Sequence, residues 1–498
     1  MSTIAEALAI AMRHHQAGRL EQAEQIYREI LQANPQHPDA MHLLGVIAHQ
    51  AGNHEAAVDL IRRAVVLKPD VADYHNNLAA ACQALGRLDE AVAGYELAVR
   101  LRPDYVEALT NLGRALQEQE KFEEAVAARQ KALQINPNYL EAHKSLGSFY
   151  QDQGQFDRAL SYYKRALEIK PDYAEAHFYR SLVWLLQADF RRGWPEYEWR
   201  WQARHFTRRD FSQSLWDGRA LNGQTILLHA EQGLGDTLQF VRYAPLVKER
   251  DGTVIVECQR PLVELLGGIA GVDRLVGAGD ELPPFDVHAP LMSLPGIFET
   301  SVENIPAEVP YLFANPALIQ RWRHVLDDLD GFKIGIGWQG RPSHSKDRYR
   351  SIPLVHFAPL ARVPGVCLVS LQKGPGVGQL AGLTDQSPVT DLGSQLDEAA
   401  GPFMDTAAVM MNLDLVVTSD TATAHLAGAL GVPVWVTLPF VPDWRWLLDR
   451  NDSPWYPTMR LFRQSRIGDW KSVFERVEAA LRRHLVSPKS GTTHKMDR

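Results

Sequence analysis

The chain has 498 residues, of which 45% are hydrophobic and 22% charged, and its formal net charge at pH 7 is −8. This length allows about three domains of ordinary size, and the negative charge argues against general binding to nucleic acid or acidic membranes. The 3 cysteines lie far apart without metal-ligand spacing, so the sequence predicts neither a disulfide framework nor a zinc site. We find no signal peptide and no apolar run that could span a bilayer, and we expect a cytoplasmic protein.

Prolines recur every 34 residues in the first third of the chain, at Pro35, Pro69, Pro103, Pro137 and Pro171. Small residues keep the same period in two further phases, Ala23, Ala57, Ala91, Ala125 and Ala159 in one and Gly45, Ala79, Gly113 and Gly147 in the other. Such a period is typical of a solenoid of paired helices, in which each proline ends the second helix of its unit. The spacing and residue types resemble the tetratricopeptide repeat over about residues 4–173.

A sixth unit begins at Ala174 but loses the period and gains aromatic side chains. These are Trp184, Phe190, Trp194, Tyr197, Trp199 and Trp201. Large apolar side chains at the end of a solenoid cap its last helix pair and can seat the next domain. We therefore predict an all-α repeat domain over residues 1–205, with five full units and a degenerate capping unit.

Asn77 and Asn111 are also 34 residues apart, on the first helix of their units. They fall on the face that lines the inner groove of such solenoids. In the O-linked N-acetylglucosamine transferases, which are similar in layout, asparagines on that face hold an extended polypeptide, because an amide both donates and accepts hydrogen bonds. The neighbouring units have Leu43 and Ser145 instead. Two interpretations therefore remain open. The pair forms an acceptor-peptide groove with at most two asparagine contacts, or Asn77 and Asn111 are simply two exposed polar residues.

After a predicted linker at residues 206–222, buried apolar runs alternate with helical segments. We expect strands at residues 225–229, 254–258, 285–288, 332–338, 366–371, 389–392 and 413–418. This alternation predicts two Rossmann-like α/β halves, residues 223–325 on the acceptor side and 326–485 on the nucleotide-sugar side, followed by a disordered tail at 486–498. Two such halves form a cleft at the carboxyl ends of their strands.

The predicted strand at residues 413–418 leads into a turn and a small-residue helix over residues 421–430. Ser419 and Asp420 are good helix N-caps. The hydroxyls of Thr421 and Thr423 lie beside free backbone N–H groups at the positive end of the helix dipole, which suits a phosphate. The alternative is an ordinary βα unit in which these residues only cap the helix.

The segment 331–375 is strongly basic in an otherwise acidic chain. It contains Lys333, Arg341, Lys346, Arg348, Arg350, Arg362 and Lys373 against the single acid Asp347. A basic cluster that follows a predicted strand end favours an anionic ligand, most simply a diphosphate or nucleotide. A solvated surface loop is the alternative.

The run DTATAHLAGALGVPV, from Asp420, resembles the bacterial ADP-heptosyltransferase family, which has a D-T-G-x-x-H-L-x-A-A-L turn at its donor phosphates. The Gly-Leu-Gly-Asp turn ending at Asp236 is similar to that family's L-G-D turn. The resemblance implies a GT-B glycosyltransferase fold over about residues 223–485, with Asp236 as general base and Lys346 on a phosphate. It also implies that Thr421 and His425 border the diphosphate and that Asp420 binds a sugar hydroxyl.

We add Arg350, Ser419 and Thr423 to the predicted donor-binding set, and Gln232, Gly233, Gly235, Trp338, Gln339 and Lys373 as further nucleotide or cleft contacts. Three positions depart from the family pattern: Ala422 replaces a glycine, Ala230 an arginine, and Gln372 a ribose-binding glutamate. The departures leave the base and the sugar of the donor open. We expect no metal and no cofactor other than the nucleotide-sugar substrate.

The layout, a repeat solenoid followed by this kind of domain, is similar to O-linked N-acetylglucosamine transferases and to bacterial flagellin glycosyltransferases. The similarity implies transfer of a sugar from a nucleotide sugar to a serine or threonine hydroxyl of a protein recruited by the repeats, with a flagellin-like acceptor among the implied partners. Two alternatives remain: a non-catalytic repeat scaffold with a degenerate GT-B domain, or a heptosyltransferase-like enzyme that acts on a saccharide or lipid. The stereochemical course, inverting or retaining, is open.

Overall fold

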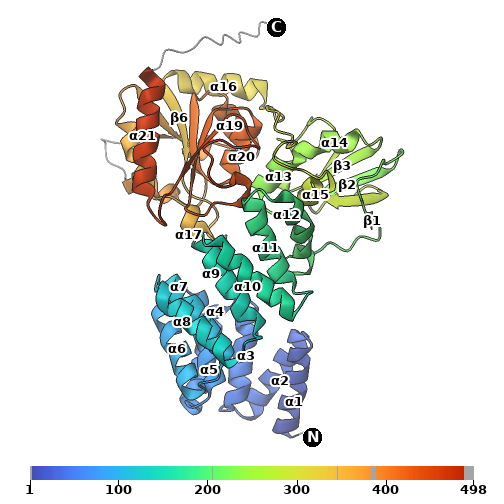
Figure 1. Ribbon diagram of the computed structural model, residues 1–498, viewed down its shortest axis with the longest axis vertical. Helices are drawn as coiled ribbons and strands as arrows, with labels where there is room; N and C mark the ends of the chain where they lie inside the picture. The colour runs from blue at the N-terminus through green and yellow to red at the C-terminus, as the bar shows by residue number, and fades with distance from the viewer. Residues whose placement is uncertain (1–2, 205, 345, 383–387, 487–498) are drawn as a thin grey trace. The chain divides into compact units, whose positions relative to one another are not determined.

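The computed structural model describes residues 3–204, 206–344, 346–382 and 388–486 (Figure 1). The chain divides into two compact units, Met1–His177 and Phe178–Arg498. Among the described residues no helix is both long enough and apolar enough to cross a bilayer. Of the predicted tail at 486–498, only Val486 lies within the described residues, as the last residue of a helix.

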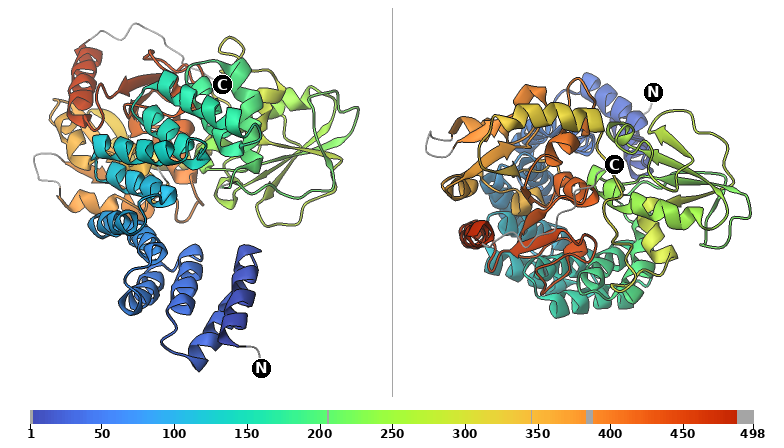
Figure 2. Two further views of the ribbon diagram at one scale, coloured as in Figure 1. Left: turned by 60° about the horizontal axis from the view of Figure 1, so that its bottom comes forward. Right: turned by 90° about the horizontal axis from the view of Figure 1, so that it is seen from above.

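The first unit is built from antiparallel helix pairs, which Figure 2 shows stacked in succession. They are α1 (Ile4–Gln16), α2 (Leu20–Ala33), α3 (Pro38–Gln50), α4 (His54–Leu67), α5 (Ala72–Ala84), α6 (Leu88–Leu101), α7 (Val106–Glu118), α8 (Phe122–Ile135), α9 (Leu140–Asp152) and α10 (Phe156–Ile169). Each second helix ends two residues before its periodic proline, as at Ala33 and Pro35. The helical solenoid predicted from the period is confirmed.

The glycine phase of the repeat is required by the close crossing of the two helices in each pair. A Cβ on Gly147 would lie 2.4 Å from Cε1 of Tyr163, and one on Gly45 would lie 2.6 Å from Cγ1 of Ile61. Protein interiors are close-packed, so contacts this short force the helices apart. The glycines at this phase therefore record a packing constraint between the two helices of their units.

The second unit begins with α11 (Ala174–Leu186), which crosses the boundary, α12 (Phe190–Tyr197) and the 3-10 turn η1 (Glu198–Gln202). Its first sheet is parallel, in the order β1-β5-β2-β3-β4. The strands are β1 (Ser214–Leu215), β2 (Thr225–His229), β3 (Thr253–Cys258), β4 (Arg274–Gly277) and β5 (Val287–Pro290). Part of the segment expected as a linker thus forms an edge strand, because Ser214 and Leu215 pair with β5.

The helical segment that follows β2 is interrupted. It consists of α13 (Leu234–Phe240), the 3-10 turn η2 (Val241–Tyr243) and α14 (Ala244–Lys248). Pro245 stands in the first turn of α14, where its missing N–H costs no hydrogen bond.

The second sheet is also parallel, in the order β11-β10-β9-β6-β7-β8. Its strands are β6 (Phe332–Gly337), β7 (Val366–Ser370), β8 (Val389–Asp391), β9 (Leu415–Ser419), β10 (Val434–Leu438) and β11 (Met459–Arg463). On one face α18 (Ala358–Ala361) packs with α21 (Trp470–Val486). On the other face lie α16 (Pro316–Asp327), α19 (Met404–Met410) and α20 (Ala422–Ala429) (Figure 1). The predicted α/β region with parallel sheets is confirmed.

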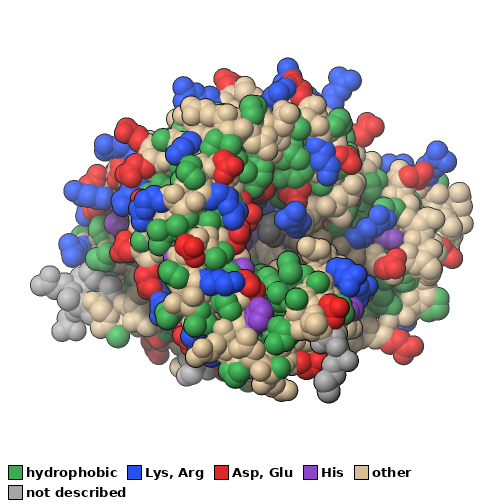
Figure 3. Space-filling model, turned by 90° about the horizontal axis from the view of Figure 1, so that it is seen from below, with side chains coloured by type: hydrophobic (Ala, Val, Ile, Leu, Met, Phe, Trp, Pro, Cys, Tyr) green, Lys and Arg blue, Asp and Glu red, His purple; other side chains and the backbone are tan. Residues whose placement is uncertain are grey.

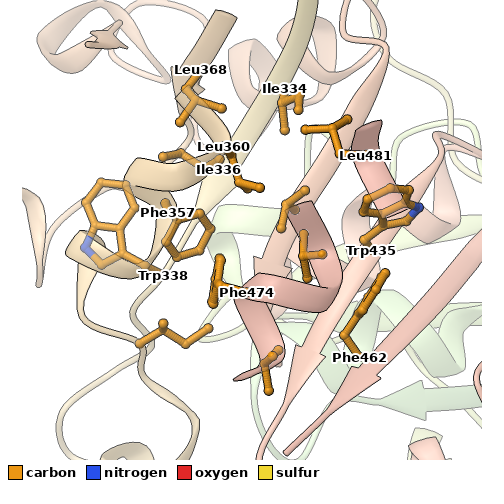
Figure 4. Close-up of a cluster of buried hydrophobic side chains, with 14 of the residues drawn as sticks. Ile334, Ile336, Trp338, Phe357, Leu360, Leu368, Trp435, Phe462, Phe474 and Leu481 are labelled. Atoms are coloured by element: carbon orange, nitrogen blue, oxygen red, sulfur yellow. The ribbon is translucent and has the colours of Figure 1, made fainter. Parts of the chain in front are cut away.

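One of the predicted site residues, Trp338, lies in the hydrophobic core under α21. Figure 4 shows Trp338 among the apolar side chains that strands β6 and β7 and helix α21 contribute. Its side chain is fully buried, and its indole N–H donates to the Gly376 carbonyl at 3.2 Å. The side chain of Trp338, which was predicted as a cleft contact, therefore belongs to the core.

Candidate active site

The two predicted turns, one from each sheet, meet in the structure. Helix α13 begins after Gly233, beyond the carboxyl end of β2, and α20 begins after Thr421, beyond the carboxyl end of β9. A Cβ on Gly235 would lie 2.8 Å from Cδ2 of His425 and 3.5 Å from Cα of Ala422. Only glycine allows this approach, so the Gly-Leu-Gly-Asp turn is shaped to pack against the start of α20.

The N-cap of α20 is Thr421, and the expectation that Ser419 or Asp420 caps this helix was wrong. Ser419 is the last residue of β9 and is fully buried. No side-chain cap reaches the α20 N-terminus among the described residues, and Thr421 Oγ1 donates weakly to the Ser419 carbonyl at 3.5 Å. Thr423 lies beside the end of β6, since a Cβ on Gly337 would come within 3.6 Å of its methyl group. The open backbone donors of this first turn suit an anion.

Arg350 is the member of the basic segment that the structure ties to this turn. It ends the short helix α17 (Asp347–Arg350), and its Nη1 donates to the Asp420 carbonyl at 3.1 Å. Its side chain is only 19% exposed, so its charge acts in a medium that screens poorly. Lys346 lies just before α17 with an exposed side chain, and its backbone N–H donates to His344 Nδ1 at 3.2 Å.

Lys373, a predicted cleft contact, pairs with Glu398 Oε1 at 2.9 Å and also donates to the Leu396 carbonyl. Gln339 accepts a hydrogen bond from Gln379 Nε2 at 3.2 Å. Both side chains therefore hold loops beyond the strand ends. Among the described residues, Lys373 forms no hydrogen bond or ion pair with the turn that Arg350 contacts.

Asp236 is held by two groups. Its Oδ2 accepts the backbone N–H of Gly233 at 2.7 Å, and its Oδ1 forms an ion pair with Arg445. Arg445, in the 3-10 turn η8 (Trp444–Trp446), also donates to Gln239 Oε1 and to Asp443 Oδ1, at 2.8 and 2.7 Å. Burial alone would lower the pKa of Arg445, but Asp443 and Asp236 outweigh it and raise the pKa. The guanidinium thus joins α13 of the first sheet to the loop after β10.

Sequence reasoning missed Arg445. The run Pro442 to Trp446 reads as an aromatic loop that packs between domains, and Trp444 does pack, 5.3 Å from the Trp194 ring. The signal that was available is Asp443 two residues before Arg445, an acid and a base on one tight turn. Nothing in the local pattern indicates that the guanidinium reaches Asp236.

Two carboxyl groups near this arginine have pKa values displaced in opposite directions. Burial, and then the negative charge of Asp443, raise the pKa of Asp420 to about 6 against the opposing effect of Arg350. Burial acts in the same sense on Asp443, but Arg445 more than offsets it, so the pKa of Asp443 is lowered. Carboxyl groups whose pKa values are pushed apart are typical of sites that move protons.

His425 is 5% exposed and lies on α20 with its ring stacked on Trp446, the centroids 5.4 Å apart. Its Nδ1 is 3.0 Å from the Tyr456 hydroxyl. Burial and then the charge of Arg445 lower the pKa of His425 to about 3. The imidazole is therefore neutral at physiological pH and acts as a hydrogen-bonding group, not as a cation.

The remaining predicted contacts hold the turns in place. Gln232 Nε2 donates to the Tyr197 hydroxyl at 3.0 Å, which ties the glycine turn to the aromatic segment. Gln372, at the position of the family's glutamate, accepts the backbone N–H groups of Trp338 and Gln339, both at 3.0 Å. Its Nε2 donates to the Gln339 and Pro375 carbonyls at 2.9 and 2.8 Å. Both the oxygen and the nitrogen of the Gln372 amide are therefore hydrogen-bonded to backbone groups that follow β6 and β7.

Beside the glycine turn lies a buried ion pair. Arg200, with a fully buried side chain, contacts both carboxylate oxygens of Glu231, at 3.2 and 3.0 Å. Burial nevertheless raises the pKa of Glu231 to about 6. The indole N–H of Trp194 donates to the Thr300 carbonyl at 2.8 Å. The aromatic segment of the sixth unit is thus part of the support of this turn.

In the solenoid, Asn77 and Asn111 are half-buried members of a hydrogen-bonded chain. Asn77 lies 2.8 Å from His42 Nε2 and accepts from Asn76 Nδ2 at 3.2 Å, and Asn111 donates to Asn76 Oδ1 at 3.2 Å. Asn76 is 1% exposed and links the two predicted rungs. Asn77 and Asn111 are therefore not isolated surface residues. Sequence reasoning missed Asn76 and His42, which lie one position earlier in their units than the predicted rungs.

Comparisons with known proteins identify the first unit. Profiles described as tetratricopeptide repeat match residues 8–72, 70–138 and 105–172, about a third of the chain. The N-terminal solenoid therefore consists of tetratricopeptide repeats, a type of domain that typically binds peptides or proteins. Those profiles do not cover the α/β region.

Protein FlbA of Caulobacter vibrioides is 27% identical over 331 residues, which is 62% of this chain and 55% of that protein. The chain thus spans about half the length of this curated relative. Among solved structures, MamA is 25% identical, with 33% of this chain and 97% of that chain covered and a TM-score of 0.30. The type IV pilus biogenesis factor PilW is 23% identical, with 41% and 93% covered and a TM-score of 0.36.

Proposed function

We propose that this chain is a glycosyltransferase of the GT-B type, which transfers a sugar from a nucleotide-sugar donor to a hydroxyl of a protein held by its repeats. The observation that carries the proposal is the packing of the two strand-end turns against each other, Gly235 against His425. Each turn follows the carboxyl end of a strand in a separate parallel sheet, which is where ligands bind in α/β folds.

The charges around the two turns support a diphosphate leaving group. Arg350 and Arg445 are both largely buried, and the first turn of α20 offers backbone donors without a side-chain cap. Fixed cations and helix N-termini stabilise the negative charge that develops on a departing phosphate. Thr421, Thr423 and His425 surround these donors on the same helix.

Asp236 is the proposed general base for an inverting course. Its carboxylate takes the proton of the acceptor hydroxyl while that oxygen forms a bond to the anomeric carbon. The bond from that carbon to the donor phosphate breaks, and the nucleoside diphosphate leaves with the electron pair. Arg445 and the Gly233 N–H fix the orientation of the carboxylate.

The second candidate function is a non-catalytic scaffold. Tetratricopeptide repeats bind proteins without chemistry, and one observation in the α/β region favours this reading. Both oxygens of Asp236 already have partners, a backbone N–H and a guanidinium, as in a purely structural helix cap. A glycosyltransferase binds a nucleotide sugar and transfers the sugar to protein, whereas a scaffold does neither, so these two measurements distinguish the functions.

The test is calorimetric titration of the full chain with UDP-, GDP- and ADP-sugars, followed by Lys346→Ala and Thr421→Val titrated with the sugar nucleotide that binds. Each substitution removes a proposed phosphate contact, so we expect roughly ten- to hundredfold weaker binding. Lys333→Ala is the matched control, because Lys333 lies near the opposite end of β6. If none of the nucleotide sugars binds, the scaffold is the better reading. If one binds and both variants bind it as well as the wild type, the donor site lies elsewhere.

A further inference from the structure

We infer that Tyr456 is a positioning residue, which fixes His425 in the tautomer that carries its proton on Nε2. That N–H then donates to a phosphate oxygen of the nucleotide-sugar donor. The inference rests on the proposed function, and it assigns a role to a buried tyrosine outside both sequence-predicted turns.

The direction of the hydrogen bond follows from the neighbours of Tyr456. Tyr311 donates its single hydroxyl proton to the Leu238 carbonyl at 2.8 Å, while its oxygen accepts from Arg242 Nη2 at 2.8 Å. Its contact with the Tyr456 hydroxyl is long, at 3.4 Å. The proton of Tyr456 is therefore available to His425 Nδ1, 3.0 Å away. A neutral imidazole that accepts at Nδ1 must carry its hydrogen on Nε2.

Arg242 anchors this chain of hydrogen bonds, which runs through Tyr311 and Tyr456 to His425. It is 5% exposed, donates to the Trp455 carbonyl at 2.5 Å, and lies over the Tyr311 and Tyr456 rings, 4.5 and 4.3 Å from their centroids. A guanidinium can only donate, so the tyrosine oxygen that faces it must accept. The polarity of the chain is thus set by a residue that cannot reverse it.

The imidazole ring cannot easily turn over to present its other nitrogen. It stacks on Trp446 with an angle of 22° between the planes, and its opposite edge faces Gly235, where even a methyl group would lie 2.8 Å from Cδ2. The charged groups that act on it are Arg445, Arg242 and Arg350, opposed by Asp443. Burial, and then three cations against one acid, lower the pKa of the ring and keep it neutral, so it donates one hydrogen bond without adding charge.

Nε2 has no hydrogen-bond partner among the residues that the structure describes, although His425 is 5% exposed. Nε2 is not one of the buried polar atoms without a partner, so solvent reaches it and an acceptor on a ligand can replace water there. His425 is the fourth residue of α20, one turn from the uncapped N–H groups that suit an anion. A phosphate oxygen at that N-terminus is the acceptor that matches this placement.

The test combines a tautomer measurement with binding. Nitrogen-15 spectra of histidine-labelled full chain, with the His425 signals assigned by His425→Gln, distinguish a protonated Nε2 from a protonated Nδ1. We expect Nε2–H in the wild type and a mixture of tautomers in Tyr456→Phe. Protonated Nδ1 in the wild type would overturn the inference.

Binding of UDP, GDP and ADP by calorimetry gives the second readout. We expect Tyr456→Phe to weaken binding of the preferred nucleotide about three- to tenfold, since one partly retained hydrogen bond is at stake. In a His425→Gln background, where the amide supplies a donor near Nε2, Tyr456→Phe should have no further effect, because Tyr456 acts through His425. Tyr243→Phe is the control, since it also removes a buried hydroxyl bond, to Thr300 at 2.8 Å.

Equal binding by wild type and Tyr456→Phe, or additive losses in the double variant, would overturn the positioning role. If the wild type binds none of the three nucleotides, the proposed function and the phosphate contact both fail. The spectrum still decides in that case whether Tyr456 sets the tautomer, so the two failures are distinguishable.

Discussion

The buried carboxyl of Asp420 makes a prediction whose sign depends on pH. Asp420 is 9% exposed, and burial together with Asp443 raises its pKa to about 6. An unfolded aspartate has a pKa of about 4. Because the folded value is the higher one, the protonated group supports the folded state at low pH, and this contribution is lost as pH rises through about 6. Replacing Asp420 with asparagine keeps the shape and removes the charge.

A difference of about two pKa units corresponds to about 3 kcal/mol, since each unit is worth about 1.4 kcal/mol. We therefore expect Asp420→Asn to raise the free energy of unfolding by up to about 3 kcal/mol at pH 7.5. The gain should shrink to roughly half at pH 5, where the folded wild type is mostly protonated, and nearly vanish at pH 4.

Tryptophan fluorescence during urea unfolding is a suitable assay. The first of the 12 tryptophans is Trp184, so all of them lie in the second unit and report on it alone. The control is Asp327→Asn, an exposed position on α16, which should change nothing. A lower stability of Asp420→Asn at pH 7.5, or the same gain at every pH, would show that Asp420 is not strained by its buried charge.

Two further outcomes are expected if the proposed function holds. Asp236→Asn should leave donor binding nearly intact and lower turnover by about a hundredfold or more, measured as sugar transfer to protein, because it removes the proton acceptor but keeps the shape; near wild-type activity would mean that Asp236 only caps α13. Removal of residues 1–140 should abolish transfer to a protein acceptor and spare nucleotide-sugar binding by calorimetry, because the proposed donor contacts lie far along the chain; unchanged transfer would mean that the repeats do not select the substrate.

Most of the fold could be predicted from local sequence patterns. The 34-residue period predicts the solenoid because each helix pair repeats one packing constraint, visible at Gly45 and Gly147. The central strands β2, β6 and β9 were predicted because strands covered on both faces are continuous apolar runs. The edge strand β8 was predicted, but the edge strands β1, β4 and β11 were missed, because they are short or carry charged side chains such as Arg274 and Arg460. Edge strands need less apolar sequence, so the pattern fades there.

The distribution of charge on the surface also bears on the kind of partner that the protein can attract. On the face shown in Figure 3, lysine and arginine side chains are interspersed with aspartate and glutamate. A mixed surface of this kind produces no strong field of one sign over that face. The buried Arg242 and Arg445 and the largely buried Arg350 contribute to the candidate site, where screening is weak, and not to that surface pattern.

The candidate site was predicted only in part, because its electrostatics are non-local. The family pattern has an arginine before the L-G-D turn, where this chain has Ala230. Read along the sequence, that is a lost residue and an argument for a degenerate domain. In the structure Asp236 nonetheless has a guanidinium partner, Arg445, 209 residues further along the chain. The alanine therefore carries little weight for the scaffold alternative.

Ala230 does not weaken the proposed function, but the contacts of Gln372 do weaken the assignment of ADP as the donor nucleotide. The glutamate of the family pattern is free to accept hydrogen bonds from a ribose, whereas Gln372 Oε1 already accepts two backbone N–H groups. Its Nε2 donates to carbonyls of the same two loops. Freeing this amide for a nucleotide would leave buried backbone donors unpaired, at a cost of about 1–3 kcal/mol each. If the chain binds a nucleotide sugar, another group must therefore bind the ribose, and ADP loses the argument that favoured it over other nucleotides.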